Sequence, residues 1–401
     1  MIELNEGISK ILSRDTKNGY DILTYIDIKI EFTEELLREF LYKIVNKYPI
    51  LKQHIVDKDS SIFLEDVESF DLSDHYKIIN DDYENFDSYA HTILNSEFTT
   101  KSKWLLYYLI DKEKGKYRVY FKIDHSYADG YKVIELLMVP LKETDTSKIF
   151  KYKASTVGIL DTLYYLTIGT ITVFFNFFII LIESVSLGSS LTSERSTAKT
   201  DHIKCKPFKL SEIKDSLKDH SITVNDFLYS LMIKTDAVYT NEKREIISCS
   251  PINISKGAHL NNMAPIINRI STSLSDKDLL QTSHSLFNLY KYSLYIPIFS
   301  FIIENIITSL PLNFLRHMYD SLIHKCDYVY SNIIGPTHES LEDIHFFTRA
   351  RDKEIVFNII SSNDNINVIC SFKEGQIKDK ARYEQCIYTA YDSLLRCNSL
   401  I

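Results

Sequence analysis

One short stretch of the sequence, residues 124–130, brings together side chains suited to acid–base chemistry: Asp124-His125-Ser126-Tyr127-Ala128-Asp129-Gly130. In the residues before it, apolar and polar side chains alternate, so His125 falls at the end of the apolar, inward face of a strand. An imidazole shielded from water in this way stays neutral, as a general base must. His125 can then take a proton from a hydroxyl group that attacks a thioester.

Two neighbours would support that histidine. Asp129 can hold the loop in shape through a salt bridge or backbone hydrogen bonds, and Gly130 permits a sharp turn out of the loop. No serine or cysteine motif indicates a covalent nucleophile, so direct transfer is the simpler scheme. The residues alone leave a second interpretation open, namely a buried structural histidine followed by an Asp-Gly turn.

The composition argues against several other kinds of chemistry. With only 10 glycines, the chain has neither a GxGxxG nor a Walker-type phosphate-binding sequence. The cysteines form no CxxC pair and no Cys/His group with zinc spacing, so we expect neither a metal nor a structural disulfide. The net charge of −8 gives no general attraction to nucleic acid. The first residues carry acids and no apolar run, which argues against a signal peptide and favours the cytosol.

The elements that would position His125 follow from periodicity. Thr33 is predicted to cap a helix with apolar residues at i, i+3, i+4, i+7 spacing, ending before Pro49. Residues 104–110 and 117–123 predict a hairpin with Gly115 in its turn, and residues 133–137 predict a buried helix.

The rest of the chain predicts a second α/β half. A Ser/Thr-rich linker is expected at residues 184–200, followed by a helix at 224–239. Strands are expected near 245–252, 326–333, 355–361 and 366–373, and a last helix at 380–395. A chain of 401 residues suits two domains. We divide it into residues 1–150, an apolar segment plus linker at 151–200, and residues 201–401.

Two stretches are unusually apolar. Residues 162–182 carry no charge and are long enough to cross a bilayer, which takes roughly 20 apolar residues. A buried core helix is the alternative. Residues 294–315 are interrupted by Pro297, Glu304 and Pro311, so core or interfacial helices are predicted there.

Several motifs resemble, in the same order, those of the wax ester synthase/diacylglycerol acyltransferase family. That family belongs to the HHxxxDG acyltransferase superfamily, which includes chloramphenicol acetyltransferase and condensation domains. His125, Asp129 and Gly130 match the second His, the Asp and the Gly of the motif, whereas Asp124 replaces the first His. The other matches are Tyr48-Pro49-Ile50-Leu51-Lys52, Trp104 without the family's preceding Pro-Leu, Thr223-Val224-Asn225-Asp226, Pro251 with Asn262, Ser331-Asn332-Ile333-Ile334-Gly335-Pro336, and strands around Phe357 and Phe372. Together they cover most of residues 30–395, apart from 150–200.

The resemblance implies an α/β fold of two chloramphenicol-acetyltransferase-like domains that form a pseudo-dimer around an active-site tunnel. It implies transfer of a long-chain acyl group from acyl-CoA to a fatty alcohol or diacylglycerol, with His125 as base and no metal or redox cofactor. Substrate contacts are then expected from Trp104, Asn225, Asp226, Ser331 and Asn332. Asn225 could hold a developing oxyanion, although Asn225 and Asp226 equally suit a simple helix N-cap.

The apolar segment at 162–182 conflicts with a shared tunnel if it crosses a membrane once, because the two halves would then face opposite compartments. It is therefore expected to re-enter, to lie in the interface, or to pair with another crossing. Lys148, Lys151 and Lys153 favour the cytosol for its first end. We expect a monomer on the cytosolic face of the endoplasmic reticulum, on lipid droplets, or on a bacterial inner membrane.

Two alternatives to this function remain. One is an acyltransferase with another acceptor, such as a sterol, a small alcohol or an amine. The other is a membrane-tethered protein that keeps the fold without catalysis, for which the missing first His leaves room.

Overall fold

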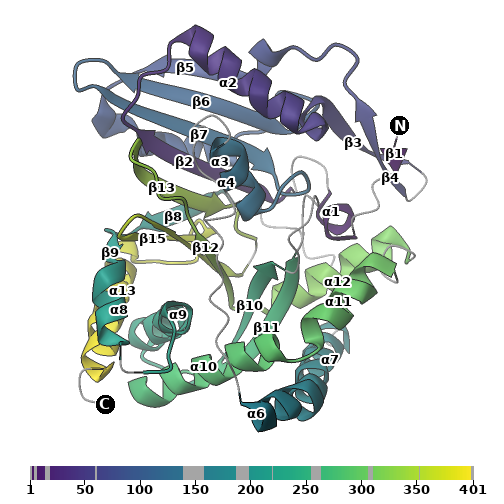
Figure 1. The fold of residues 1–401 in the computed structure, drawn as a ribbon, viewed down its shortest axis with the longest axis vertical. Helices are drawn as coiled ribbons and strands as arrows, with labels where there is room; N and C mark the ends of the chain where they lie inside the picture. The colour runs from purple at the N-terminus through teal and green to yellow at the C-terminus, as the bar shows by residue number, and fades with distance from the viewer. Residues whose placement is uncertain are drawn as a thin grey trace.

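Two large β-sheets organise the chain in the computed structural model, shown in Figure 1. The structure describes residues 2–3, 7–13, 19–58, 61–138, 158–186, 198–218, 220–253, 263–305, 310–351 and 353–398. One sheet comes mainly from the N-terminal half and the other from the C-terminal half. Helices pack against both sheets, so the predicted mixed α/β fold of two domains is confirmed.

The N-terminal sheet has the strand order β13-β2-β7-β6-β5. Its strands are β2 (Asp21–Ile28), β5 (Tyr76–Asn80), β6 (Trp104–Asp111), β7 (Lys116–Asp124) and β13 (Leu341–Thr348). Its helices are α2 (Glu34–Lys47) and α4 (Gly130–Met138) on one face and α3 (Ser88–Asn95) on the other. Beside it lie α1 (Gly7–Leu12), a small sheet of β1 (Ile2–Glu3), β4 (Ser61–Asp66) and β3 (Gln53–Lys58), and 3₁₀ helices at Pro49–Lys52, Leu72–His75 and Tyr83–Asn85.

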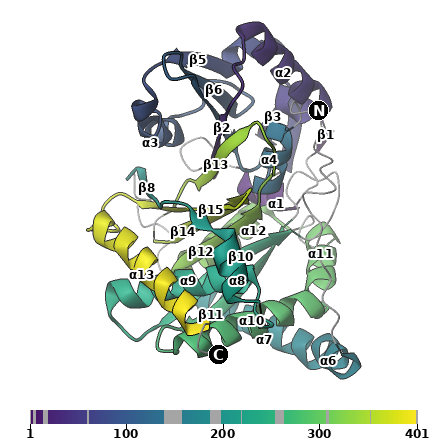
Figure 2. The ribbon, with the colours of Figure 1, turned by 60° about the vertical axis from the view of Figure 1, so that its left-hand side comes forward.

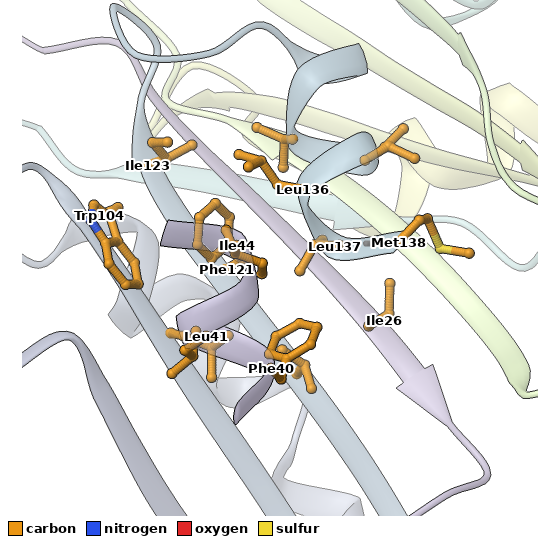
Figure 3. Packing of buried hydrophobic residues seen from close by; sticks show 14 of the residues in the cluster. Ile26, Phe40, Leu41, Ile44, Trp104, Phe121, Ile123, Leu136, Leu137 and Met138 are labelled. Atoms are coloured by element: carbon orange, nitrogen blue, oxygen red, sulfur yellow. The ribbon is translucent and has the colours of Figure 1, made fainter. Parts of the chain in front are cut away.

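The helix predicted after Thr33 is α2. The hydroxyl of Thr33 accepts a hydrogen bond from the backbone N–H of Leu36 (3.3 Å), which caps the helix as predicted. Its apolar stripe packs with α4 against the sheet, and Figure 3 shows Phe40, Leu41 and Ile44 among residues of β7 and α4.

The predicted hairpin is confirmed by β6 and β7. The two strands pair antiparallel from Trp104 opposite Ile123 to Asp111 opposite Lys116. Gly115 has a φ of 59°, in the left-handed region that glycine adopts most easily, and this allows the tight turn.

The C-terminal sheet has the order β11-β10-β12-β14-β15-β8, with β9 also paired to β15. Its strands are β8 (Thr200–Lys204), β9 (Phe208–Lys209), β10 (Glu245–Asn253), β11 (Met263–Ser271), β12 (Tyr328–Ile334), β14 (Ile355–Ser362) and β15 (Asn365–Lys373). The four strands predicted in this half correspond to β10, β12, β14 and β15. The others were not predicted.

Helices cover both faces of this sheet. Those in the core around β14 and β15 are α8 (Leu210–Ser216), α9 (Val224–Thr240) and α13 (Lys380–Asn398), joined by the start of α10 (Asp276–Tyr292). Against β10 and β11 lie α7 (Thr170–Ser186), α11 (Tyr295–Asn305) and α12 (Leu312–Lys325). α11 and α12 confirm the helices that were predicted for the apolar residues 294–315.

β13 ties the two halves together. This strand comes from residues assigned by the sequence to the C-terminal half, yet it pairs antiparallel with β2, from Leu341 opposite Ile28 to Thr348 opposite Ile22. The division at residues 150 and 200 therefore does not separate the two sheets cleanly. Figure 1 shows β13 between the N-terminal sheet and β15.

The first apolar stretch is one continuous helix. α6 (Ile159–Tyr164), a π-helical turn (Tyr165–Gly169) and α7 follow one another without a break. The segment Ile159–Glu183 suffices by length and composition to cross a membrane, since an 18-residue window within it has a mean hydropathy of 2.1. Only 17% of that window is buried in the structure. That low burial does not fit the core-helix alternative. The expected linker begins within α7, and its residues 187–197 lie outside the described ranges.

Candidate active site

β7 ends at Asp124, and His125 begins the turn that leads into α4. The backbone N–H of His125 donates to the carbonyl oxygen of Tyr20 (2.7 Å), which fixes the turn to the residue before β2. Asp124 Oδ1 accepts hydrogen bonds from the backbone N–H of Ser126 (2.9 Å) and from its hydroxyl. Asp124, which replaces the first His of the motif, therefore shapes the turn that carries His125.

A cavity of about 230 Å³ lies beside this turn. His125, Asp129 and Gly130 line it from the N-terminal half, and Ser331 and Asn332 line it from β12 of the C-terminal half. The rest of its wall is mostly apolar and includes side chains from α1, α7, α11 and α12. The fold thus brings five of the eight predicted site residues to one space.

Asp129 holds the start of α4. Its Oδ1 accepts from the backbone N–H of Lys132 (2.8 Å), and its carbonyl oxygen accepts from Val133 (2.9 Å), the pattern of a helix N-cap. The residue is buried, with 9% of its surface exposed. Asp129 therefore holds the loop through backbone hydrogen bonds, as predicted, and it also lines the cavity.

Gly130 is needed for close packing, and the sharp turn expected of it is not what the structure shows. Its φ is not positive, since the described glycines in the left-handed region are Gly115 and Gly375. A Cβ on Gly130 would lie 2.4 Å from Cδ1 of Ile333 and 3.2 Å from the ring of Phe346. A glycine here lets α4 approach Ile333 of β12 and Phe346 of β13.

The second face of β7 is buried as well, whereas the alternation predicted one inward face. It carries ion pairs: Lys122 Nζ lies 3.2 Å from Asp21 Oδ2, and Arg118 donates two hydrogen bonds to Asp27 (2.6 and 2.8 Å). These charges stay buried because they are paired and because α3 and β15 of the other sheet cover that face. Periodicity could not show this, since the covering elements are distant in sequence.

Asp21 and Arg349 are cavity residues that the sequence did not indicate. Arg349 Nη1 lies 3.4 Å from Asp21 Oδ2, and both residues line the cavity. Burial raises the pKa of Asp21 although Lys122 and Arg349 oppose that shift, and burial lowers the pKa of Lys122. Neither Asp21 nor Arg349 belongs to a motif. Only the pairing of β13 with β2 could have pointed to these two residues.

Asn225 and Asp226 lie one layer behind the cavity. Asn225 Oδ1 accepts from Asn332 Nδ2 (2.9 Å) and from the Tyr330 hydroxyl (3.1 Å). Asp226 and Thr223 form a reciprocal capping box at the start of α9, and His284 Nδ1 is 2.8 Å from Asp226 Oδ2. Neither residue lines the cavity, so the helix-cap alternative describes Asp226, and Asn225 acts on the cavity only through Asn332.

Trp104 lies in the N-terminal core, away from the cavity. Its side chain is fully buried, its Nε1 donates to the carbonyl oxygen of Leu51 (2.8 Å), and its ring stacks on His75 at 4.2 Å. Figure 3 shows it beside the residues that pack α2 onto the sheet. The expected substrate contact is therefore corrected to a packing role.

One group of side chains in the described ranges could hold a metal ion. The ligand atoms of His91, Asp201 and His202 lie within 4.8 Å of one another. Lys380 Nζ already pairs with Asp201 at 3.0 Å, and none of the three residues lines the cavity. This group is therefore separate from the chemistry expected at His125.

The family comparison concerns the C-terminal half. Residues 261–395 match the model of the WS/DGAT (wax ester synthase/diacylglycerol acyltransferase) C-terminal domain. No curated protein sequence matches the chain.

Solved structures match over nearly the whole chain at low identity. The wax ester synthase/diacylglycerol acyltransferase from Marinobacter aquaeolei VT8 is 11% identical, with a TM-score of 0.61 and 99% of each chain covered. The TRI3 trichothecene 15-O-acetyltransferase from Fusarium sporotrichioides is 12% identical, with a TM-score of 0.64 and coverage of 98% of this chain and 94% of that one. A starter condensation domain of rhizomide synthetase, a mutant in complex with C8-CoA and Leu-SNAC, is 9% identical, with a TM-score of 0.56 and coverage of 100% and 93%.

These neighbours share a two-domain chloramphenicol-acetyltransferase-like architecture, and they establish the fold of the chain. The predicted resemblance is therefore confirmed: residues 261–395 match the model of the C-terminal domain of the wax ester synthase/diacylglycerol acyltransferase family, and the chain as a whole has the fold of these neighbours.

Proposed function

We propose that the chain is an O-acyltransferase that moves a long-chain acyl group from acyl-CoA to the hydroxyl of a fatty alcohol or a diacylglycerol. The observation that carries the proposal is the cavity between the two halves, where His125 and Asn332 meet a mostly apolar wall. A pocket with few polar groups in an apolar lining suits a long acyl chain, and the polar groups mark the reacting end. The condensation-domain neighbour was solved with C8-CoA, which supports a thioester donor on this fold.

His125 is the general base in this scheme. It takes the proton of the acceptor hydroxyl while that oxygen attacks the carbonyl carbon of the thioester. A C–O bond forms, and the former carbonyl oxygen carries the negative charge. The intermediate collapses by breaking the C–S bond, and the imidazolium of His125 returns its proton to the CoA thiolate. No other cofactor is required.

Asn332 and Ser331 are polar residues of the opposite half that line the cavity. The Asn332 amide carries two N–H groups, and one of them donates to Asn225 Oδ1, which orients the amide at the cavity wall. A donor preorganised at the cavity wall stabilises a developing oxyanion far better than a mobile water does. We assign this role to Asn332, with Asn225 as the residue that orients it.

We also place the enzyme at the cytosolic surface of a membrane or lipid droplet, as a monomer. The apolar helix Ile159–Glu183 and the lipid nature of the proposed acceptors support this location.

A purified-protein assay with radiolabelled palmitoyl-CoA tests the function directly. The acceptors should include hexadecanol, dioleoylglycerol, a sterol, a short alcohol and an amine. We expect labelled wax ester or triacylglycerol together with stoichiometric release of free CoA thiol. Release of CoA without a labelled ester would indicate hydrolysis and would refute the transferase reaction.

Two rival functions give other patterns in the same assay. The trichothecene acetyltransferase shares the fold but, by its name, acylates an unrelated acceptor, so the fold does not choose the acceptor. If product forms only with the sterol or only with the amine, the proposed acceptor class is wrong and that compound's class replaces it. The absence of any turnover would favour a protein without catalysis. The replacement of the first His by Asp124 does not by itself indicate such a protein, because Asp124 has a structural role in the turn.

A further inference from the structure

The helix that runs through α6 and α7 is apolar on two opposite faces. One face carries Val173, Phe177, Ile180 and Leu181, which pack into the body, and Phe177 and Leu181 reach the cavity. The opposite face, which we call the outer stripe, consists of Ile171, Phe175, Phe178 and Ile182. These four residues are exposed to 67%, 64%, 50% and 63%. A helix that is apolar all round is typical of a membrane or of a fully buried position, and this one is not buried.

The outer stripe is part of a larger apolar surface. α6 adds Ile159, Leu160 and Leu163, and α11 and α12 add the exposed rings of Phe301 and Phe314. Figure 1 shows α7, α11 and α12 on one side of the molecule, and Figure 2 shows α6 projecting from its lower end. Large exposed apolar side chains on neighbouring helices, as here, are typical of an interaction site.

The polar groups of this helix indicate a lipid partner. The hydroxyls of Thr162, Thr167, Thr170 and Thr172 donate to backbone carbonyl oxygens one turn earlier, at 2.7–3.0 Å. Their hydrogen bonds are thus satisfied within the helix, as a hydrocarbon environment demands. Asn176, on the flank between the two faces, is the one amide in residues 162–182.

Charged and aromatic residues bracket the apolar surface. Asp161 stands at its start, and at its end Glu183 pairs with Arg269 (2.5 Å). The ring of Tyr165 lies 5.6 Å from those of Tyr164 and Tyr292, near the first end. Tyrosines and ion pairs at the edges of an apolar band are typical of segments at a membrane–water interface.

We propose that this surface docks flat into one leaflet of a lipid layer, and that the acceptor reaches the cavity sideways from the leaflet between α7 and α11. The route follows from continuity: Phe177 and Leu181 of α7 and Phe299 of α11 line the cavity, while Phe175, Phe178 and Phe301 of the same helices face outward. The outer stripe and the cavity thus lie on opposite sides of α7, one helix diameter apart, about 10 Å, and the route past the helix runs between α7 and α11. This inference rests on the proposed transfer to a lipid acceptor and adds how that acceptor arrives.

Vesicle flotation with pure phosphatidylcholine tests the docking without any need for activity. We expect wild type to float and the double variant Phe175→Glu/Phe178→Glu to lose at least 10-fold in vesicle partitioning, because the charges must enter hydrocarbon. The matched control is Leu36→Glu/Tyr42→Glu on α2, which alters side chains exposed to 47% and 50% on the distant N-terminal half. The control should float like wild type. Equal flotation of all three proteins overturns the docking surface. The proposal is also overturned if wild type binds no vesicles but is a dimer, and the outer-stripe variant is a monomer.

Turnover separates the docking from the chemistry. The outer-stripe variant should lose at least 10-fold in turnover of dioleoylglycerol in vesicles, yet stay within twofold of wild type for a short water-soluble alcohol. Leu181→Trp narrows the wall between leaflet and cavity, so it should lower turnover of the long acceptor while flotation is unchanged. Unchanged long-acceptor turnover in Leu181→Trp overturns the sideways route. A wild type that floats but transfers to no acceptor refutes the proposed function and leaves the docking surface standing.

Discussion

His125 faces the cavity because its backbone is held on both sides. Its N–H is bonded to Tyr20, and Asp124 closes the turn through Ser126. His125→Ala removes the proposed base but none of these backbone bonds. We expect turnover to fall by about 100-fold or more, the usual scale for a positioned base, with little change in thermal stability.

Initial rates with saturating palmitoyl-CoA and a melting curve for the same preparation check this. Ser126→Ala is a suitable control, because its backbone N–H still bonds Asp124 while its hydroxyl, which does not line the cavity, is removed. Near wild-type turnover in His125→Ala would exclude this residue as the base.

Asp129 combines a helix cap with a place at the cavity. Asp129→Ala removes the acceptor of the Lys132 N–H, so we expect a loss of about 1 kcal/mol in the free energy of unfolding, together with reduced activity. Asp129→Asn keeps the capping oxygen and should restore most of the stability. Urea unfolding of both variants measures the difference. Equal destabilisation by Ala and Asn would show that the charge, rather than the cap, holds the loop.

At the scale of single elements, the end of β12 is tightly packed against β14. The N–H of Gly335 donates to the carbonyl oxygen of Ser361 (2.7 Å), and an added Cβ would lie 2.4 Å from that same oxygen. Backbone cannot move aside as a flexible side chain can. Gly335→Ala should therefore cost about 1–3 kcal/mol of stability, as overpacking usually does, and should displace Ser331 and Asn332.

Gly375→Ala is the matched control for that substitution. Gly375 has a φ of 85° but nothing within 4 Å of a Cβ, so only the backbone conformation is penalised, by roughly 1 kcal/mol. Thermal melts of the two variants, with activity, provide the comparison. If Gly335→Ala is as stable as wild type and fully active, the close pairing of β12 with β14 is not required.

Local elements were predictable because their signals are local. The cap at Thr33, the glycine turn at Gly115 and the capping residues before α9 all act within a few residues, and each element was found where expected. The pairing of β13 with β2 joins residues from opposite ends of the chain, and no local pattern encodes it. Asp21 and Arg349 were missed for that reason, since β13 leads directly to Arg349.

Resemblance and geometry also diverge at Trp104. A motif marks a position in the fold, and that position can serve packing as well as binding. The ring of Trp104 lies between His75 and Phe121 in the core. Its match to the family motif therefore predicted the position of the strand correctly, but not a substrate contact. For Asn225 the expected role was closer to the observed one, because Asn225 accepts a hydrogen bond from Asn332 at the cavity wall.

For the molecule as a whole, the junction between the halves should make stability depend on pH. His202 of β8 packs edge-on to Phe347 of β13 (5.1 Å), and burial lowers the pKa of His202 to about 4, against opposition from Asp201. In the unfolded chain the imidazole of His202 takes up a proton near pH 6.5. In the folded chain it takes up that proton only near pH 4. Stability is therefore lost as the pH falls from about 6.5 toward 4.

Comparison with His202→Gln isolates this contribution from the other buried histidines. Between pH 7 and pH 5, wild type should lose about 2 kcal/mol more in its free energy of unfolding than the variant does. Urea titrations at the two pH values measure both losses. If the two proteins lose the same amount, His202 does not titrate between the folded and unfolded states as described.

The same junction decides how the chain can sit at a membrane. β2 lies before the apolar helix and β13 lies after it, yet the two strands are hydrogen-bonded along their length. One complete crossing by Ile159–Glu183 would place these strands on opposite sides of the bilayer and break the N-terminal sheet. Tags at Met1 and Ile401 should therefore be equally sensitive to protease in sealed microsomes, with both exposed on the cytosolic side. Limited proteolysis of the untagged chain is an independent check, and it should likewise cut both halves from one side. Protection of only one tag would mean that the strands are apart in the membrane-bound protein, and the cavity shared by His125 and Asn332 could not then be its active site.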